Sequence, residues 1–333
     1  MRTPHPATSR RKLVAAAALA LTTALLGLPG TAAAAAQPIK CDDTVTGQAD
    51  SYPGPRASDT YDNLFDNSWR VPGLATHIPQ GTATWSNWDG EDDLILVAGY
   101  DELGKTSSVI NGIDARTGEN VGHAKIEYSH VGGIAVFERQ GWAYVSGPQD
   151  RTVRKYNLAE LREAIKSTEE GPLQPKGADQ TVHGSSFLTS HGPTNTLWAG
   201  QFLDDTRSHM SSYTVADNGD LEQRPGFWEV PRKTQGLVVT EDLFIYSTSH
   251  GRNNRSNIYV VRRGEGSSRL DTARLSCFRA PSMSEGLAVY GDHVYVVYES
   301  GADYYSHAHD KPDNVITELH KAPIARLDHL APR

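Results

Sequence analysis

A pattern repeated five times along the chain constrains the fold more than any other feature. In its clearest copy, Glu285-Gly286 precedes an apolar strand, a tight turn at Gly291 and a second strand rich in Val and Tyr at 293–298. The glycine recurs at steps of 52, 51, 52 and 50 residues, at Gly81, Gly133, Gly184, Gly236 and Gly286. Near-equal repeats of strands and turns with this period are typical of radial repeat folds, above all the β-propeller.

Each repeat has room for four strands. In the first repeat, strands are expected at 82–85, 94–98, 108–114 and 121–128. The second repeat adds a short helix after Asn157, a residue type that caps helices. We therefore predict an all-β chain that forms a single five-bladed β-propeller of four-stranded blades. A six-bladed alternative would use residues 40–70 as most of a blade, but that stretch lacks the repeated pattern.

The last repeat is incomplete. It ends with a strand at 314–319, and no strong fourth strand follows it. Residues 74–78 precede the first repeat and have strand character, so they are expected to supply the missing strand. This "velcro" closure, in which both ends of the chain share one blade, leaves no sheet edge open.

The repeated pattern resembles that of secreted bacterial β-propellers of the broad YVTN/TolB-like type, and the resemblance covers nearly the whole mature chain. It is a resemblance of blade pattern. It therefore implies the fold and no particular activity.

The first 36 residues are expected to be a signal peptide. Basic residues that include Arg10 and Arg11 precede an apolar run at 13–28, and small residues at 31–34 offer cleavage sites. The apolar run is short for a membrane span. The paired arginines also resemble a twin-arginine signal, so Sec and twin-arginine export both stay open. We predict a secreted, extracellular protein with an extended arm at 37–70 and the propeller at 71–333.

The net charge limits the classes of partner, and the two cysteines indicate a disulfide. The formal net charge is −8, and no basic stripe is present, which argues against nucleic acid or an anionic membrane surface as a partner. Two cysteines in an oxidising compartment indicate one disulfide, between Cys41 and Cys277. We expect a monomer that binds an extracellular small molecule or glycan, or a secreted protein.

A binding site is expected on one face of the disc. In a four-stranded blade, the connections between the second and third strands lie on the same face as those that lead into the next blade's inner strand. Such loops are where rigid scaffolds usually carry function. Residues in the second-to-third connections give these ligand-binding candidates: Tyr100, Asp101, Gln201, His250, Arg252, Arg255, Tyr298, Glu299 and Tyr304. Residues that lead into inner strands give a second set: His77, Gln80, His130, His183, Gln235 and Glu285.

The second set could support chemistry at the central axis. Glu285 paired with His130 or His183 could act as a general base beside a polarising group. The same residues could hold a divalent metal, although no cofactor is required, or they could line a water-filled channel. Tyr304 and the other loop tyrosines could stack on sugar rings, and Arg252 and Arg255 could bind a carboxylate or sulfate.

No catalytic motif names a reaction. The chain has no G-x-S-x-G elbow, H-E-x-x-H, C-x-x-C or P-loop. The leading hypothesis is a recognition protein that binds a carbohydrate or another extracellular ligand at the loop-rich face. The alternative is an extracellular hydrolase or lyase that uses Glu285 and the histidines, with or without a metal. A scaffold role is a third hypothesis, which occlusion of that face by residues 40–70 would favour.

Overall fold

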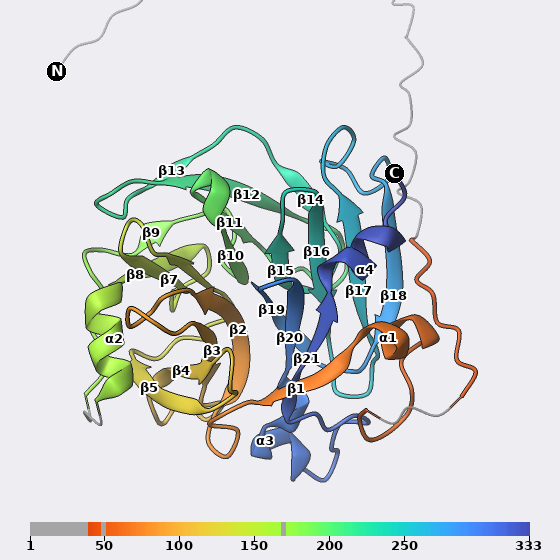
Figure 1. The fold of residues 1–333 in the computed structure, drawn as a ribbon, viewed down its shortest axis with the longest axis horizontal. Coiled ribbons are helices and arrows are strands. Elements are labelled where there is room, and N and C mark those ends of the chain that lie inside the picture. Colours follow the sequence, from red (N-terminus) through yellow and green to blue (C-terminus); the bar gives the residue numbers. More distant parts are fainter. Residues whose placement is uncertain (1–38, 48–50, 168–170) are drawn as a thin grey trace, which may run out of the picture. The chain divides into compact units, whose positions relative to one another are not determined.

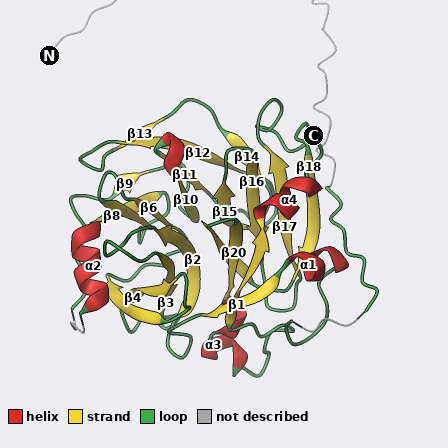
Figure 2. Cartoon of the chain, in the orientation of Figure 1, coloured by secondary structure: helices red, strands yellow, loops and turns green. Residues whose placement is uncertain are grey.

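Five antiparallel sheets surround a central axis and form a five-bladed β-propeller (Figures 1 and 2). The computed structural model describes residues 39–47, 51–167 and 171–333, so the expected signal peptide lies outside the described residues. The inner strands contact one another in the order β2, β6, β10, β15, β19 and back to β2. The ring is therefore closed, and the five-bladed prediction is confirmed over the six-bladed alternative.

Each blade runs outward from its inner strand. Blade 1 consists of β2 (Ile78–Trp85), β3 (Leu94–Tyr100), β4 (Ser108–Asp114) and β5 (Asn120–Ile126). Blade 2 consists of β6 (Ile134–Phe137), β7 (Trp142–Ser146), β8 (Thr152–Asn157) and β9 (Gln180–Thr181). Blade 4 consists of β15 (Thr234–Val239), β16 (Leu243–Thr248), β17 (Ser256–Arg262) and β18 (Leu275–Ala280).

Blade 3 divides its outer strand in two. It consists of β10 (Phe187–His191), β11 (Thr196–Gly200), β12 (Ser208–Val215), β13 (Leu221–Gln223) and β14 (Trp228–Val230), with the 3₁₀ helix η1 (Gly192–Thr194) in the inner hairpin. β13 pairs with one end of β12 and β14 with the other, so the two short strands share the fourth position of the blade.

Four short helices lie outside the sheets in the described part of the chain. The predicted helix of the second repeat is α2 (Leu158–Lys166), whose N-cap Asn157 accepts hydrogen bonds from the amides of Ala159 and Glu160. The others are α1 (Asp59–Leu64), α3 (Asp303–Ser306) and α4 (Ile324–Leu330), and the 3₁₀ helix η2 (Glu299–Gly301) precedes α3. No helix among the described residues is long and apolar enough to cross a bilayer.

Blade 5 closes the ring with both ends of the chain. It consists of β19 (Ser284–Tyr290), β20 (His293–Tyr298), β21 (Glu318–Pro323) and, as the outer strand, β1 (Asp66–Arg70) from the N-terminal side. The predicted velcro closure is therefore present, but its strand is β1 rather than residues 74–78. Residues 72–76 form turns between β1 and β2, so the strand character of that stretch reflects only its apolar composition.

Neighbouring inner strands approach very closely at the repeated glycines. A Cβ added at Gly236 would lie 2.5 Å from the carbonyl oxygen of Glu285, and one at Gly286 would lie 2.5 Å from that of Gln80. Contacts of this kind occur at four glycines, Gly81, Gly133, Gly236 and Gly286. Together with the equivalent residue of blade 3, Phe187, we call these the axial positions. Glycine is favoured at the four because a residue without a side chain permits this backbone approach.

The third axial position differs from the sequence assignment. The repeat pattern pointed to Gly184, but a Cβ at Gly132 would meet the carbonyl of Ser186 and one at Gly133 the amide of Leu188. These two groups flank Phe187, so Phe187 takes the place that glycine has in the other blades. Gly200 accommodates its ring, because a Cβ there would lie 2.1 Å from the ring carbon Cζ.

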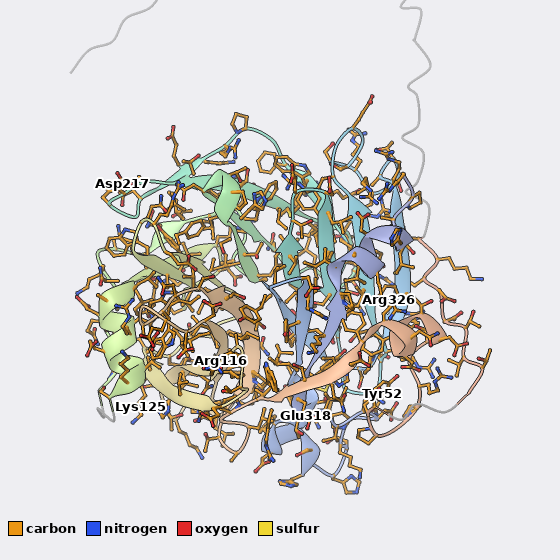
Figure 3. All side chains as sticks on the ribbon, in the orientation of Figure 1. Tyr52, Arg116, Lys125, Asp217, Glu318 and Arg326 are labelled. Carbon is orange, nitrogen blue, oxygen red and sulfur yellow. A yellow bond between two sulfur atoms is a disulfide. The ribbon has the colours of Figure 1, made fainter. Side chains whose placement is uncertain are left out.

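The N-terminal arm is fixed to blade 4 by the predicted disulfide between Cys41 and Cys277, which is present and joins residues 236 apart in sequence. Beside it, the Asp42 amide donates to the Cys277 carbonyl over 2.8 Å, and α1 packs against β18. Apolar side chains fill the space between adjacent sheets (Figure 3). The arm therefore adds a covalent closure to the hydrogen-bonded one in blade 5.

The axial contacts predict that adding a methyl group destabilises the fold at an axial glycine and has little effect at an open one. Gly286→Ala should lower the free energy of unfolding by about 2–3 kcal/mol, because its Cβ would meet backbone atoms that cannot move aside. Gly192→Ala is the matched control, since a Cβ there has nothing within 4 Å, and it should be close to neutral. Urea unfolding measures both; equal stabilities for the two variants would contradict the axial constraint.

Candidate functional site

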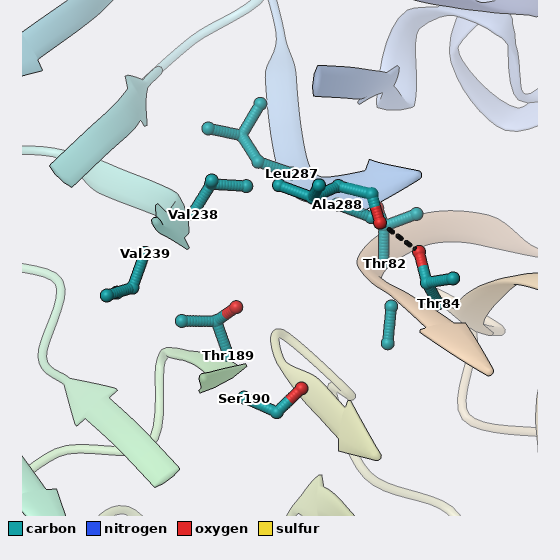
Figure 4. A pocket seen from close by; sticks show the side chains of 10 residues that line it. Thr82, Thr84, Thr189, Ser190, Val238, Val239, Leu287 and Ala288 are labelled. Atoms are coloured by element: carbon teal, nitrogen blue, oxygen red, sulfur yellow. Dashed lines mark hydrogen bonds between the residues drawn. The ribbon is translucent and has the colours of Figure 1, made fainter. Parts of the chain in front are cut away.

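The middle of the central axis is narrow. A cavity of about 80 Å³ lies there, lined by β2, β10, β15 and β19 through side chains such as Thr82, Thr189, Val238 and Leu287 (Figure 4). Thr84 Oγ1 donates to the carbonyl of Val289 across the blade 5 to blade 1 seam over 2.5 Å. No titratable side chain is among its lining residues, so the sequence-predicted histidines do not meet there.

A larger cavity opens at one end of the axis. It has a volume of about 370 Å³, and we call it the axial cavity; its lining residues are His130, Gly132, Ser146, Gly147, Pro148, Gln149, Asp150, Ser185, Ser186, Phe202 and Gln235. These residues come from connections that lead into inner strands and from connections between second and third strands. The two types of loop therefore share one face, as the sequence predicted.

The residue before each axial position borders this end of the axis. Three of the five, Gly132, Ser186 and Gln235, line the axial cavity. The other two, Gln80 and Glu285, occupy the same position in blades 1 and 5 of this ring of residues, but they are buried and are not among the residues that line the cavity. Gln235 adjoins Glu285 because Gly236 packs directly against the Glu285 carbonyl. The site is thus a polar mouth lined by blades 2, 3 and 4, with Glu285 of blade 5 next to it.

Glu285 and Glu299 form a carboxyl pair on the blade 5 side of this ring. Glu285 is only 2% exposed, and its Oε1 has no hydrogen-bond partner among the described residues. Glu299, in η2, is partly buried and accepts a hydrogen bond from Gln80 Nε2, which also donates to the carbonyl of Pro79. Two carboxyl groups from neighbouring segments therefore share a poorly solvated space.

Burial keeps protons on this pair. Loss of solvent raises the pKa of Glu299 to about 8, and the nearby charge of Glu102 acts in the same direction. Burial likewise raises the pKa of Glu285 well above its ordinary value, with a further contribution from the negative charge of Glu299. Glu299 therefore keeps its proton at neutral pH, and once ionised its charge would further oppose ionisation of Glu285.

Aromatic and charged side chains surround the pair. The Tyr100 hydroxyl hydrogen-bonds to Glu102 and to Tyr305, and burial raises the pKa of both tyrosines. The guanidinium of Arg252 lies 5.0 Å from the centre of the Tyr305 ring and is paired with Asp310. Two loops, 249–255 of blade 4 and 299–317 of blade 5, thus meet over the carboxyl pair.

His130 links this cluster to the axial cavity. Its ring lies 4.4 Å from the ring of Tyr100, centre to centre, and it also lines the cavity. His183 lies elsewhere. Its Nε2 is 3.1 Å from Gln223 Oε1 on β13, and its ring packs edge-on against Phe227 at 4.8 Å. A direct pairing of Glu285 with either histidine is therefore not observed in the described part of the chain.

Tyr298 is buried in the core rather than at the loop-rich face. Its hydroxyl hydrogen-bonds to that of Tyr61 over 2.5 Å, and Tyr61 also contacts His320 Nδ1 at 2.7 Å. Successive side chains along β20 point to opposite faces of the sheet. Tyr298 therefore enters the core, and the next residue in the chain, Glu299, faces the axis. Tyr298 therefore helps α1 pack on blade 5.

The other predicted ligand-binding residues are spread around the face. His77 contacts the Ser107 carbonyl at 3.0 Å, and Asp101 accepts hydrogen bonds from its own loop. His250 Nδ1 is 2.9 Å from Asp204. Gln201 is partly buried, whereas Arg255 and Tyr304 are exposed. The structure brings together Gln80, Tyr100, Arg252, Glu285 and Glu299, with His130 and Gln235 alongside.

The described residues contain no group of three or more His, Cys, Asp or Glu side chains placed to hold a metal ion. Phe202 and Tyr305 were expected from the sequence only as rings that could stack on a sugar. Residues of the site that were missed among the candidates include Glu102, Ser146, Gln149, Asp150, Ser185 and Ser186. Glu102 lies in the same loop as selected residues, so its loop position was a usable signal. Ser186 was hidden by the assignment of the third axial position to Gly184.

Comparison with known proteins identifies no family. No family model and no curated protein matches the chain. Among solved structures, the chain is similar to Kuenenia stuttgartiensis hydrazine synthase, at 13% identity and a TM-score of 0.38 over 68% of this chain and 58% of that one. It is also similar to the Cps50 (Swd1) β-propeller domain of Myceliophteria thermophila, at 9% identity and a TM-score of 0.35 over 71% and 66%.

The chain thus spans less than two thirds of each of these structures. At such scores the likeness carries no functional inference, and the fold assignment rests on the sheet topology. Membership of the YVTN/TolB-like type stays a prediction.

The raised pKa of Glu299 predicts how stability depends on pH. The folded carboxyl keeps its proton up to about pH 8, whereas the unfolded one ionises near 4.5, so Glu299 lowers stability progressively between these values. Glu299→Gln should therefore gain stability relative to the wild type as pH rises from 4.5 to 9, by on the order of 2 kcal/mol after allowing for partial exposure. Melting temperatures across this range measure it.

Glu265→Gln is the control, because Glu265 is exposed in a loop of blade 4. It should shift the melting temperature equally at both pH values. If the melting temperatures of Glu299→Gln and the wild type differ by the same amount at every pH, this carboxyl ionises normally in the folded protein.

Proposed function

We propose that this protein is a secreted β-propeller that binds a carbohydrate in the axial cavity of its loop-rich face. The observation that carries the proposal is the cavity itself, about 370 Å³ in volume and lined by hydroxyl, amide, imidazole and carboxylate groups together with the Phe202 ring. Sugars need this combination, since their hydroxyls exchange hydrogen bonds and their C–H faces pack on aromatic rings.

Access to the cavity supports a binding role over a scaffold role. None of its lining residues belongs to the described part of the segment 40–70, which is 40–47 and 51–70. That part instead contacts blades 4 and 5, for example where Asn314 Nδ2 donates to the carbonyls of Pro53 and Pro55 over 2.9 and 3.0 Å, and contacts blade 1 through Trp69. The described part of the arm therefore leaves the polar mouth clear.

Export is the second part of the proposal. Disulfides such as that between Cys41 and Cys277 form and persist in oxidising compartments. The first 36 residues have the composition of a signal peptide. Protein recovered from the culture medium should begin near residue 37, which intact mass and N-terminal sequencing measure. Retention of the full-length chain inside the cell would contradict export, and replacing Arg10 and Arg11 with lysine separates the twin-arginine from the Sec route.

The binding experiment is a glycan array with the mature, disulfide-bonded protein, followed by calorimetry on the best glycan. Phe202→Ser should weaken binding about tenfold, because it removes the aromatic surface of the cavity. Leu203→Ser is the matched control, since Leu203 is the neighbouring residue, is 37% exposed and is not among the residues that line the cavity. Binding of no glycan, or equal losses in the two variants, would overturn the proposal.

Hydrolysis of the same ligand is a second candidate function, and the carboxyl pair favours it. Glu299, with a pKa of about 8, holds a proton at neutral pH that it could donate to a leaving group. In this role Glu299 takes the place that the sequence hypothesis gave to the histidines. Incubation of the bound glycan with wild type and Glu299→Gln decides it, because cleavage by the wild type alone would make the protein an enzyme.

A further inference from the structure

We propose that Glu285, Glu299, Tyr100 and Tyr305 form a subsite for a protonated amine, so that the ligand is an amino sugar. This inference rests on the proposed carbohydrate binding and names the chemical class of the ligand. Four observations support it, and they concern charge, hydrogen bonding, aromatic faces and position.

The first observation is the charge of the subsite. Three carboxyl groups, Glu102, Glu285 and Glu299, influence one another there, and Arg252 is the cation that acts on Glu299. Arg252 is itself paired with Asp310, so its charge is shared with a fourth carboxylate. The balance of the surrounding groups therefore favours one more positive charge on the ligand side.

The second observation is the unpartnered oxygen. Glu285 Oε1 is buried without a hydrogen-bond donor among the described residues, a state that costs about 1–3 kcal/mol when it persists. Gln80, the nearby amide donor, is already engaged with Glu299 and Pro79. An ammonium group has three N–H donors, which would suit Oε1, Glu299 and a tyrosine hydroxyl together.

The third observation is that one of the two tyrosine rings, Tyr305, already contacts a cation. The Arg252 guanidinium lies over the Tyr305 ring at 5.0 Å, which is the geometry of a cation–π contact. Tyr100 lies beside Tyr305, to which it is hydrogen-bonded, and is only 5% exposed. Two tyrosine rings next to carboxylates favour an organic ammonium over a neutral hydroxyl, because rings attract cations whereas hydroxyls gain little from them.

The fourth observation is that this subsite adjoins the axial cavity. Gln235 lines the cavity and neighbours Glu285, and His130 lines the cavity and stacks near Tyr100. The proposal therefore places a sugar ring in the cavity and directs its amine past His130 and Gln235 toward the carboxyl pair, which is itself not among the lining residues. Binding of an ammonium there would displace the proton that burial keeps on the pair, since the positive charge replaces it.

The test compares two probes that differ at the amine alone, the β-1,4-linked dimers of glucosamine and N-acetylglucosamine, with the mature protein at neutral pH. The amino dimer should bind about tenfold more tightly, the gain expected from charge-assisted hydrogen bonds. Calorimetry in two buffers of different ionisation enthalpy should also show a proton released on its binding. The acetylated dimer should release none.

Glu299→Gln and Glu102→Gln should each reduce the ratio of the two affinities, amino dimer over acetylated dimer, toward one. Glu102 is exposed in its loop, so its variant keeps the test valid should changes at the buried pair impair folding. Glu265 lies in the loop between β17 and β18 of blade 4 and is not part of the subsite. Glu265→Gln should therefore leave the preference for the amino dimer unchanged.

Equal affinity for the two dimers, or a preference that survives both Glu299→Gln and Glu102→Gln, would overturn the inference. Failure of the glucosamine dimer while neutral glycans on the array bind would also overturn it and leave the proposed function standing. Failure of every glycan would overturn both.

Discussion

The whole fold depends on how closely five inner strands can approach one axis. At four axial positions glycine allows backbone to meet backbone, and at the fifth Phe187 is tolerated because Gly200 makes room for its ring. The same constraint positions the site. The residues before the axial positions come to the same end of the axis although they are about fifty residues apart in sequence. Gly132, Ser186 and Gln235 line the cavity there, and Gln80 and Glu285 are buried beside it.

Much of the architecture followed from local pattern. The number of blades, the helix after Asn157 and the disulfide could be predicted because glycine spacing, capping and cysteine count each report directly on structure. The closing strand was misplaced because residues 74–78 and β1 are both short, and pairing with β21 depends on the whole ring having formed. A tertiary constraint of this kind leaves little trace in local composition.

The site was predictable in outline only. Loop position and repeat position were enough to select Gln80, Glu285, Tyr100, Arg252 and Glu299. They could not indicate that Glu285 would meet Glu299 instead of a histidine, because the conformation of η2 decides which way that loop turns. Side-chain direction at a strand end is equally hidden, which is why Tyr298 enters the core while its neighbour faces the axis.

The disulfide has a mechanical consequence. Residues 42–276 lie inside the covalent loop that Cys41 and Cys277 close, so a force applied between a point before Cys41 and the C-terminus bypasses them. The load passes through the sulfur bond into β18 and onward through the strands of blade 5. Blades 1 to 3, and with them most of the axial cavity lining, would carry no tension until that bond is reduced. A chain pulled between its two ends would thus keep blades 1 to 3 folded under shear.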